Sequence, residues 1–149
     1  MSDFYCNDNI SFIAATGVHR DVEYIIVGID GSHPTAYIRL DSEGFEKCPL
    51  TVEDYYDPRL DAIDAHGGFT FLNDYLFLVP NHPLPGRFIG WDYMHPGDAM
   101  REIDTSDFRK YKYVGHKWTI EEITVECEHV IDQLLALAWK EKYEKEKHK

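Results

Sequence analysis

The stretch VEYIIVGIDGSHPTAYIRL, residues 22–40, decides the fold of this chain. It joins two β-rich runs, VEYIIVGI and TAYIRL, through the turn-forming residues Asp30-Gly31-Ser32-His33-Pro34. Two such runs on either side of a Gly and Pro turn are typical of an antiparallel hairpin. We therefore expect a hairpin over residues 22–40 and a further short strand before it, over Ile10 to Ala15. Residues 41–64 show no sustained period and should form a loop or a short helix.

Two further runs downstream predict more strands. Gly68–Leu72 and Tyr75–Val79 flank Asn73-Asp74, which favours a second tight hairpin. Arg87–Tyr93 predicts another strand, and it follows a segment rich in Pro and Gly, residues 80–86, that should interrupt regular structure.

The C-terminal segment predicts a long helix. Thr119 and Glu122 match the S/T-x-x-E capping box, which marks a helix start. Apolar residues then recur at steps of three or four, at Ile123, Cys127, Val130, Leu134 and Ala138. We expect a helix from about Ile120 to about Tyr143 that packs its apolar face across the sheet. The predicted fold class is α+β, an antiparallel sheet built from hairpins with a long C-terminal helix packed across it.

Length and composition favour one folded domain over residues 1–149, with residues 139–149 as a solvated, charged helix end. The chain has 149 residues, 44% of them hydrophobic and 28% charged, which are near-average values for globular proteins. No apolar run reaches the ~20 residues of a membrane-spanning helix, and Met1 to Asn9 lacks the pattern of a secretory signal. Cys6, Cys48 and Cys127 form no close pair, so we expect reduced thiols in a cytosolic protein and neither a disulfide framework nor a cysteine metal site.

The net charge of −12 argues against binding to DNA or RNA. Such binding depends on Lys and Arg side chains that displace counterions from phosphates. Five lysines and three glutamates make Lys140–Lys149 the one basic patch, and their alternating signs are typical of a solvated helix end. We expect no nucleic-acid polymer and no membrane as a partner.

A first candidate site segment is Asp64-Ala65-His66-Gly67-Gly68-Phe69-Thr70. Paired glycines can adopt positive φ and allow backbone amides to approach an anion. A plain turn before a strand explains the same glycines equally well. The ligand-binding residues that we expect here are His66, Gly67, Gly68 and Thr70.

A second candidate segment is Gly90-Trp91-Asp92-Tyr93-Met94-His95-Pro96-Gly97-Asp98. It places Asp, His and Asp at three-residue spacing, and Pro96 predicts a loop after the strand. We expect Trp91, Asp92, Tyr93, His95 and Asp98 to contribute to ligand binding. Structural roles are the alternative, with Asp92 accepting turn amides and His95 satisfied in the interior.

Several chemistries suit these two segments. Imidazoles titrate near neutrality, so His66 and His95 are candidate acid and base, with Asp92 holding a tautomer if the protein is an enzyme. The ligand spacing matches no recognised zinc motif, and we predict neither a metal nor a cofactor. Aromatic residues make up 14% of the chain, and a subset at a rim could stack a planar base while Arg87 or the glycine amides meet a phosphate.

Residues 64–98 resemble small proteins encoded by bacteriophages and prophages. Those proteins share a His-Gly-Gly, hydrophobic, Thr segment and a Gly-aromatic-Asp-x-x-His segment, here His66–Thr70 and Gly90–His95, with Asp98 shortly after. The helix core Glu126-Cys127-Glu128 is also similar. The resemblance implies a phage origin and an action in the host cytosol, but no mechanism. Small acidic phage proteins often disarm host defences, and some sequester or cleave nucleotide immune signals.

The leading hypothesis is therefore a phage accessory protein, forming a homo-oligomer, that binds or sequesters a small phosphorylated nucleotide-like ligand. The first alternative is a hydrolase or phosphodiesterase that cleaves such a ligand with His66 and His95 as acid and base. The second alternative is an acidic inhibitor that occupies a basic host partner. The first two depend on one spatial expectation, that folding brings His66 and its glycines beside the later aspartates.

Overall fold

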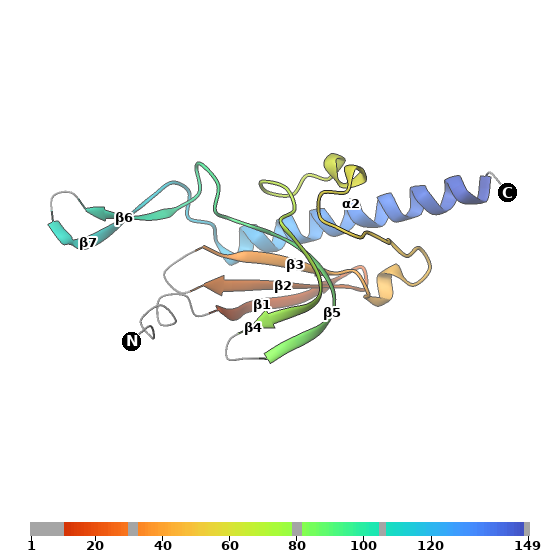
Figure 1. Cartoon of the computed structure of the whole chain (residues 1–149), viewed down its shortest axis with the longest axis horizontal. Helices are drawn as coiled ribbons and strands as arrows, with labels where there is room; N and C mark the ends of the chain where they lie inside the picture. The colour runs from red at the N-terminus through yellow and green to blue at the C-terminus, as the bar shows by residue number, and fades with distance from the viewer. Residues whose placement is uncertain (1–10, 30–32, 79–81, 105–106, 148–149) are drawn as a thin grey trace.

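The computed structural model describes residues 11–29, 33–78, 82–104 and 107–147. Five antiparallel strands form one sheet in the order β1-β2-β3-β5-β4, with bounds β1 Ser11–His19, β2 Val22–Ile29, β3 Thr35–Arg39, β4 Phe71–Leu78 and β5 His82–Asp92. The helix α2, Ile120–Lys147, lies across one face of this sheet (Figure 1). The predicted α+β class is thus confirmed.

The helix begins at the predicted capping box. The Glu122 amide donates to Thr119 Oγ1 at 3.2 Å, and the Thr119 amide donates to Glu122 Oε1 at 3.0 Å. This reciprocal pair satisfies two amides that a helix start leaves without an intrahelical acceptor. The helix ends at Lys147, four residues beyond the expected end, and all five of the predicted apolar-stripe residues are buried.

The first hairpin is confirmed as β2 and β3, which pair from Tyr24–Ile38 to Val27–Thr35. The predicted turn residues Asp30, Gly31 and Ser32 lie outside the described residues. The expected preceding strand is present and longer, because β1 runs to His19 and turns into β2 through Arg20 and Asp21, both at positive φ. The segment 41–64 holds two short 3-10 helices, η1 Glu43–Phe45 and η2 Pro58–Ala62.

The predicted hairpin turn at Asn73-Asp74 is wrong. One strand, β4, runs through both residues, and its pairing with β5 shifts register between Asn73 and Tyr75. Asn73 Oδ1 accepts the Asp74 amide at 2.9 Å, so the side chain satisfies a backbone group inside an irregular strand rather than at a reversal.

Residues 80–86 were expected to interrupt regular structure, but residues 82–86 form the first half of β5. It tolerates Pro83 and Pro85 because β3 pairs with β5 only from Phe88 onward. Before that point β5 is paired on one side by β4 alone, and proline is accepted on a strand whose other edge makes no ladder. Of the segment, Pro80 and Asn81 lie outside the described residues.

A second, two-stranded sheet follows β5 and had no counterpart in the sequence predictions. It consists of β6, Met100–Asp104, and β7, Asp107–Val114, which pair with each other. We call this hairpin the arm, because it projects away from the five-stranded sheet (Figure 1).

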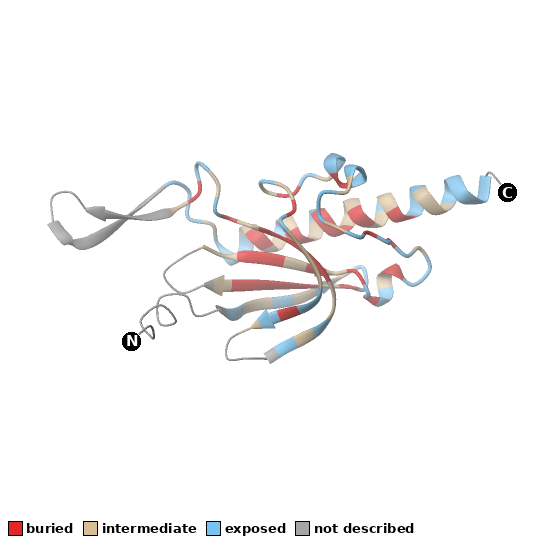
Figure 2. Ribbon diagram, in the orientation of Figure 1, coloured by how far each residue is buried: buried red, intermediate tan, exposed pale blue. Residues whose placement is uncertain are grey.

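Apolar clusters cover both faces of the sheet (Figure 2). Ile26 and Ile38 face α2, whereas Ile25 and Val27 pack with Leu76 and Phe88 on the opposite face. Burial on both faces explains why β2 reads as a continuous apolar run rather than an alternating one. Within the described residues, no helix combines the length and apolar character needed to cross a membrane.

Two valines of α2 provide a matched test of the helix packing. Val130 is fully buried, whereas Val125 is 66% exposed. Val130→Ala should lower the free energy of unfolding by about 2 kcal/mol, since it removes two buried methyl groups and leaves a cavity. Val125→Ala makes the same propensity change and should stay within ~0.5 kcal/mol of wild type. Urea denaturation measures both, and equal effects would contradict the assigned face of the helix.

Candidate functional site

The first candidate segment forms a turn held by the helix. The His66 amide donates to Glu126 Oε2 at 3.0 Å, and the Asp64 amide donates to Gln133 Oε1 at 2.7 Å. Gly67 and Gly68 then take positive φ values of 70° and 83°. Such angles are costly for residues with a Cβ, so the paired glycines serve this turn directly.

The second segment leaves β5 and turns back through its own aspartates. Asp92 Oδ1 accepts the Met94 amide at 3.1 Å, and Asp98 Oδ2 accepts the His95 amide at 2.9 Å. The Asp98 amide in turn donates to the His95 carbonyl at 2.9 Å. Asp92 therefore accepts a turn amide, as its predicted structural alternative states. Together with the bonds of Asp98, this fixes the direction in which the His95 side chain leaves the backbone.

The Asp98 carboxylate is the most enclosed carboxylate of the site, with only 3% of the residue exposed. His66 Nε2 lies 2.8 Å from both carboxylate oxygens, and Trp118 Nε1 donates to Oδ1 at 2.8 Å. Burial alone raises the pKa of Asp98, but the hydrogen bonds from His66, the His95 amide and Trp118 outweigh it and hold this pKa below its ordinary value. Asp98 is therefore ionised at neutral pH.

His95 is held less completely than His66. Its Nε2 lies 3.1 Å from Asp92 Oδ1, but the angles do not make a hydrogen bond, and this buried nitrogen has no hydrogen-bond partner among the described residues. Thr70 Oγ1 donates to the other Asp92 oxygen at 3.0 Å. Each imidazole thus lies beside its own aspartate. His66 Nε2 is hydrogen-bonded to Asp98, whereas His95 Nε2 is not hydrogen-bonded to any of the described residues.

The two imidazoles lie together, with ring centroids 5.6 Å apart and planes at 70°. The spatial expectation that His66 and its glycines lie beside the later aspartates is confirmed. His66 also stacks on Tyr93 at 4.7 Å and meets Trp118 at 4.8 Å. We call His66 and His95 the histidine pair.

Tyr93 and Trp91 do not have the predicted role of stacking on a base. Each is only 1% exposed, because the alternation of β5, continued by Tyr93 directly after the strand, turns both toward α2. Trp91 Nε1 donates to the Tyr93 hydroxyl at 3.1 Å, and that hydroxyl donates to Glu126. Burial first, and the bond to Glu126 second, raise the pKa of Tyr93, so it remains a neutral phenol beneath His66.

Arg87 also lies away from the histidine pair. It sits six residues before Tyr93, about 20 Å along a strand. Its guanidinium donates to Asp74 Oδ1 at 2.9 Å and to the Val52 carbonyl at 2.6 Å. Arg87 therefore does not share a site with the histidine pair, and its predicted contact with a phosphate stays a prediction.

Two residues of the site were not predicted, Trp118 and Glu126. Trp118 precedes the capping box by one residue, which gives no pattern of its own. Glu126 appeared in the sequence only as part of Glu-Cys-Glu. It lies on α2 between the buried Ile123 and Cys127, and its carboxylate accepts from His66 in the first segment and from Tyr93 in the second. No group of three or more His, Cys, Asp or Glu side chains among the described residues is arranged to hold a metal ion.

The arm begins next to Asp98 and ends next to Trp118. The Ala99 amide donates to the His116 carbonyl, and the His116 amide donates to the Gly97 carbonyl, both at 2.7 Å. Asp98 is thus on the outgoing side of the arm and Trp118 on the returning side. Their hydrogen bond closes the base of the arm next to His66.

Comparison with family models, with curated proteins and with solved structures finds no match to the chain. The site is therefore interpreted from its own geometry.

Asp98→Asn should destabilise the protein by about 3 kcal/mol at neutral pH. The amide nitrogen of Asn cannot accept the hydrogen bonds that the buried carboxylate accepts. Because the pKa of Asp98 is lowered by folding, its contribution is present above the ordinary value of 3.8 and is lost as the pH falls through the folded value. Urea denaturation of wild type and variant should therefore show a difference that shrinks below about pH 4. A difference that is constant with pH would contradict the assignment.

The two glycines of the turn provide a second matched pair. A Cβ at Gly67 would lie 2.2 Å from His95 Nε2, whereas a Cβ at Gly68 would meet no atom within 4 Å. Both alanine variants carry a similar backbone cost of about 1 kcal/mol. Only Gly67→Ala should move the His95 ring, seen as large shifts of its imidazole resonances in NMR spectra. Similar His95 shifts in Gly68→Ala would show that the backbone, not the close approach, is responsible.

Proposed function

We propose that the histidine pair binds a small phosphorylated ligand, with both imidazoles contacting phosphate oxygens. The observation that carries this proposal is the pairing of two imidazoles 5.6 Å apart, each beside its own aspartate. Protonated imidazoles donate charge-assisted hydrogen bonds to phosphate, and a ring held by a carboxylate loses little freedom on binding. The Gly67-Gly68 turn beside them leaves room for a ligand at Gly68.

The nucleotide character of the ligand has less support than its phosphate. With Trp91 and Tyr93 buried, Trp118 is the partly exposed aromatic ring next to His66. The proposal that the protein acts as a phage accessory protein against host defence rests on the resemblance of the two motif segments. In that setting, a ligand that is held and not released would be withdrawn from the host.

Three carboxylates, those of Asp92, Asp98 and Glu126, surround the histidine pair. These carboxylates repel a phosphate, so binding requires that hydrogen bonds and positive charge from the imidazoles outweigh this repulsion.

The unequal state of the two rings favours hydrolysis as a second candidate function. His66 Nε2 faces an ionised, buried carboxylate, so this nitrogen carries the proton, and Nδ1 is the basic nitrogen of the neutral ring. His95 Nε2 lacks a hydrogen bond within the described residues, so no partner fixes the tautomer of this ring. Two neighbouring imidazoles in unequal surroundings could act as the acid and the base of phosphoester cleavage.

Isothermal titration with cyclic dinucleotides and ADP-ribose derivatives tests the binding proposal. His66→Gln and His95→Gln should each weaken binding about tenfold or more, because each removes a charge-assisted hydrogen bond. His129→Gln on the exposed side of α2 is the matched control and should leave the affinity unchanged. Absence of heat with every ligand, or equal losses in all three variants, would overturn the proposal.

Mass spectrometry of the ligand recovered after denaturation separates the two candidate functions. A sequestering protein returns the ligand intact. A hydrolase returns the cleaved product, and the cleavage should be lost in both His66→Gln and His95→Gln.

A further inference from the structure

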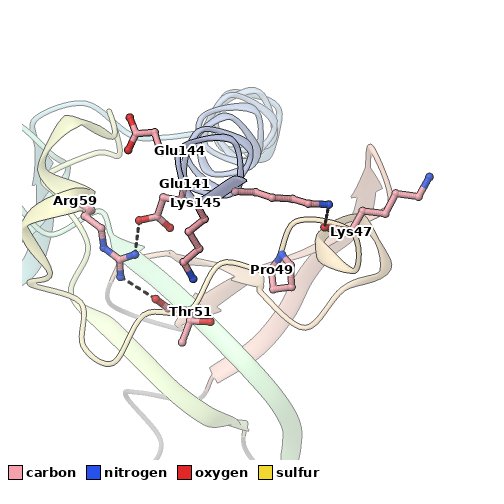
Figure 3. A pocket seen from close by; sticks show the side chains of 8 residues that line it. Lys47, Pro49, Thr51, Arg59, Glu141, Glu144 and Lys145 are labelled. Carbon is pink, nitrogen blue, oxygen red and sulfur yellow. Dashed lines mark hydrogen bonds and ion pairs between the residues drawn. The ribbon is translucent and has the colours of Figure 1, made fainter. Parts of the chain in front are cut away.

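A groove with basic walls lies at the far end of the helix from the histidine pair. It has a volume of about 810 Å³ and lies between the last turns of α2 and residues 47–59. Four basic and two acidic side chains line it, and its walls include Lys47, Thr51, Arg59, Glu141, Lys142 and Lys145 (Figure 3). We call it the lysine groove. A net positive lining is unexpected in a chain with a net charge of −12.

Arg59 builds one wall of the groove rather than offering a free charge. Its guanidinium donates to Asp57 through Nε and Nη2, to the Thr51 carbonyl at 2.8 Å, and to Glu141. These bonds connect η2, the Thr51 segment and α2. The carboxylates of Asp57 and Glu141 are therefore already paired, and they oppose an incoming anion less than free carboxylates would.

The lysines supply the remaining positive charge. Lys142 Nζ donates to the Lys47 carbonyl at 3.0 Å, which holds its ammonium near the groove. Lys145 extends toward the Thr51 segment, whereas Glu144 and the ammonium end of Lys47 both point away from it (Figure 3). No hydrogen bond or ion pair within the described residues engages Lys145 Nζ. Lys142 and Lys145 are three residues apart on α2 and both line the groove, with the Lys142 ammonium at the Lys47 carbonyl and Lys145 directed toward the Thr51 segment.

We propose that the lysine groove binds a small ligand that carries adjacent phosphate groups, as a pyrophosphate ester does. Lysine is a point charge that suits phosphate, and neighbouring lysines suit neighbouring anionic groups. The volume lies in the range of small-molecule sites, about 300–1,000 Å³. The groove is separate from the proposed phosphate site at the histidine pair. Glu126, at that pair, and Glu141, in the groove, are fifteen residues apart, which is about 22 Å along a helix.

Titration of inorganic pyrophosphate into the full chain at low ionic strength tests the groove. Lys145→Glu and Lys142→Glu should each weaken binding about tenfold or more, since each replaces an attractive charge with a repulsive one. Lys140→Glu is the matched control: Lys140 is exposed on the same helix but does not line the groove, and its affinity should change less than about twofold. Absence of heat in wild type, or equal weakening in the control, overturns the proposal.

A double variant, His66→Gln with His95→Gln, separates this site from the histidine pair. Pyrophosphate binding should persist in the double variant and be lost when Lys145→Glu is added. If the double variant abolishes binding while Lys145→Glu alone does not affect it, the groove proposal fails and the proposed function stands. Binding that persists through all three substitutions also overturns the groove proposal.

Discussion

The buried carboxylate of Asp98 is the constraint around which the site is organised. An ionised carboxylate with 3% exposure is tolerable only when donors surround it, and here the donors come from three separate segments. His66 belongs to the turn before β4, the His95 amide to the loop after β5, and Trp118 to the approach to α2. Satisfying one charge thus determines how three loops meet.

The helix adds a second polar connection beneath the same loops. Glu126 accepts the His66 amide with one oxygen and the Tyr93 hydroxyl with the other. Because Tyr93 stacks under His66, the carboxylate controls both the backbone and the underside of that imidazole. His66 is therefore restrained from three directions. Asp98 accepts from both His66 and Trp118, so the closed base of the arm and the proposed binding role of the histidine pair depend on the same carboxylate.

The elements predicted correctly are those whose signals are local. The capping box at Thr119 and Glu122 and the stripe through Val130 need only neighbouring residues to be recognised. Asn73-Asp74 gave a wrong prediction of a turn, because the Asn73 side chain accepts a neighbouring backbone amide within a strand rather than at a chain reversal. The arm lacked any strong local pattern. The nearness of His66 and His95 depends on β4 and β5 pairing side by side, a long-range outcome that the two motif segments indicated only jointly.

The burial of Trp91 and Tyr93 shows how the period of a strand limits functional interpretation. Ile89 and Trp91 of β5, and Tyr93 directly after the strand, pack in the core that meets α2, and Asp92 between the two rings points to the other side. An aromatic residue next to a candidate ligand-binding aspartate on a strand therefore points into the core, on the opposite side from the aspartate. Once these rings are assigned to the core, the groups left to meet a ligand are imidazoles and a glycine turn. This composition favours an anionic group over a planar base as the part of the proposed ligand that meets the histidine pair.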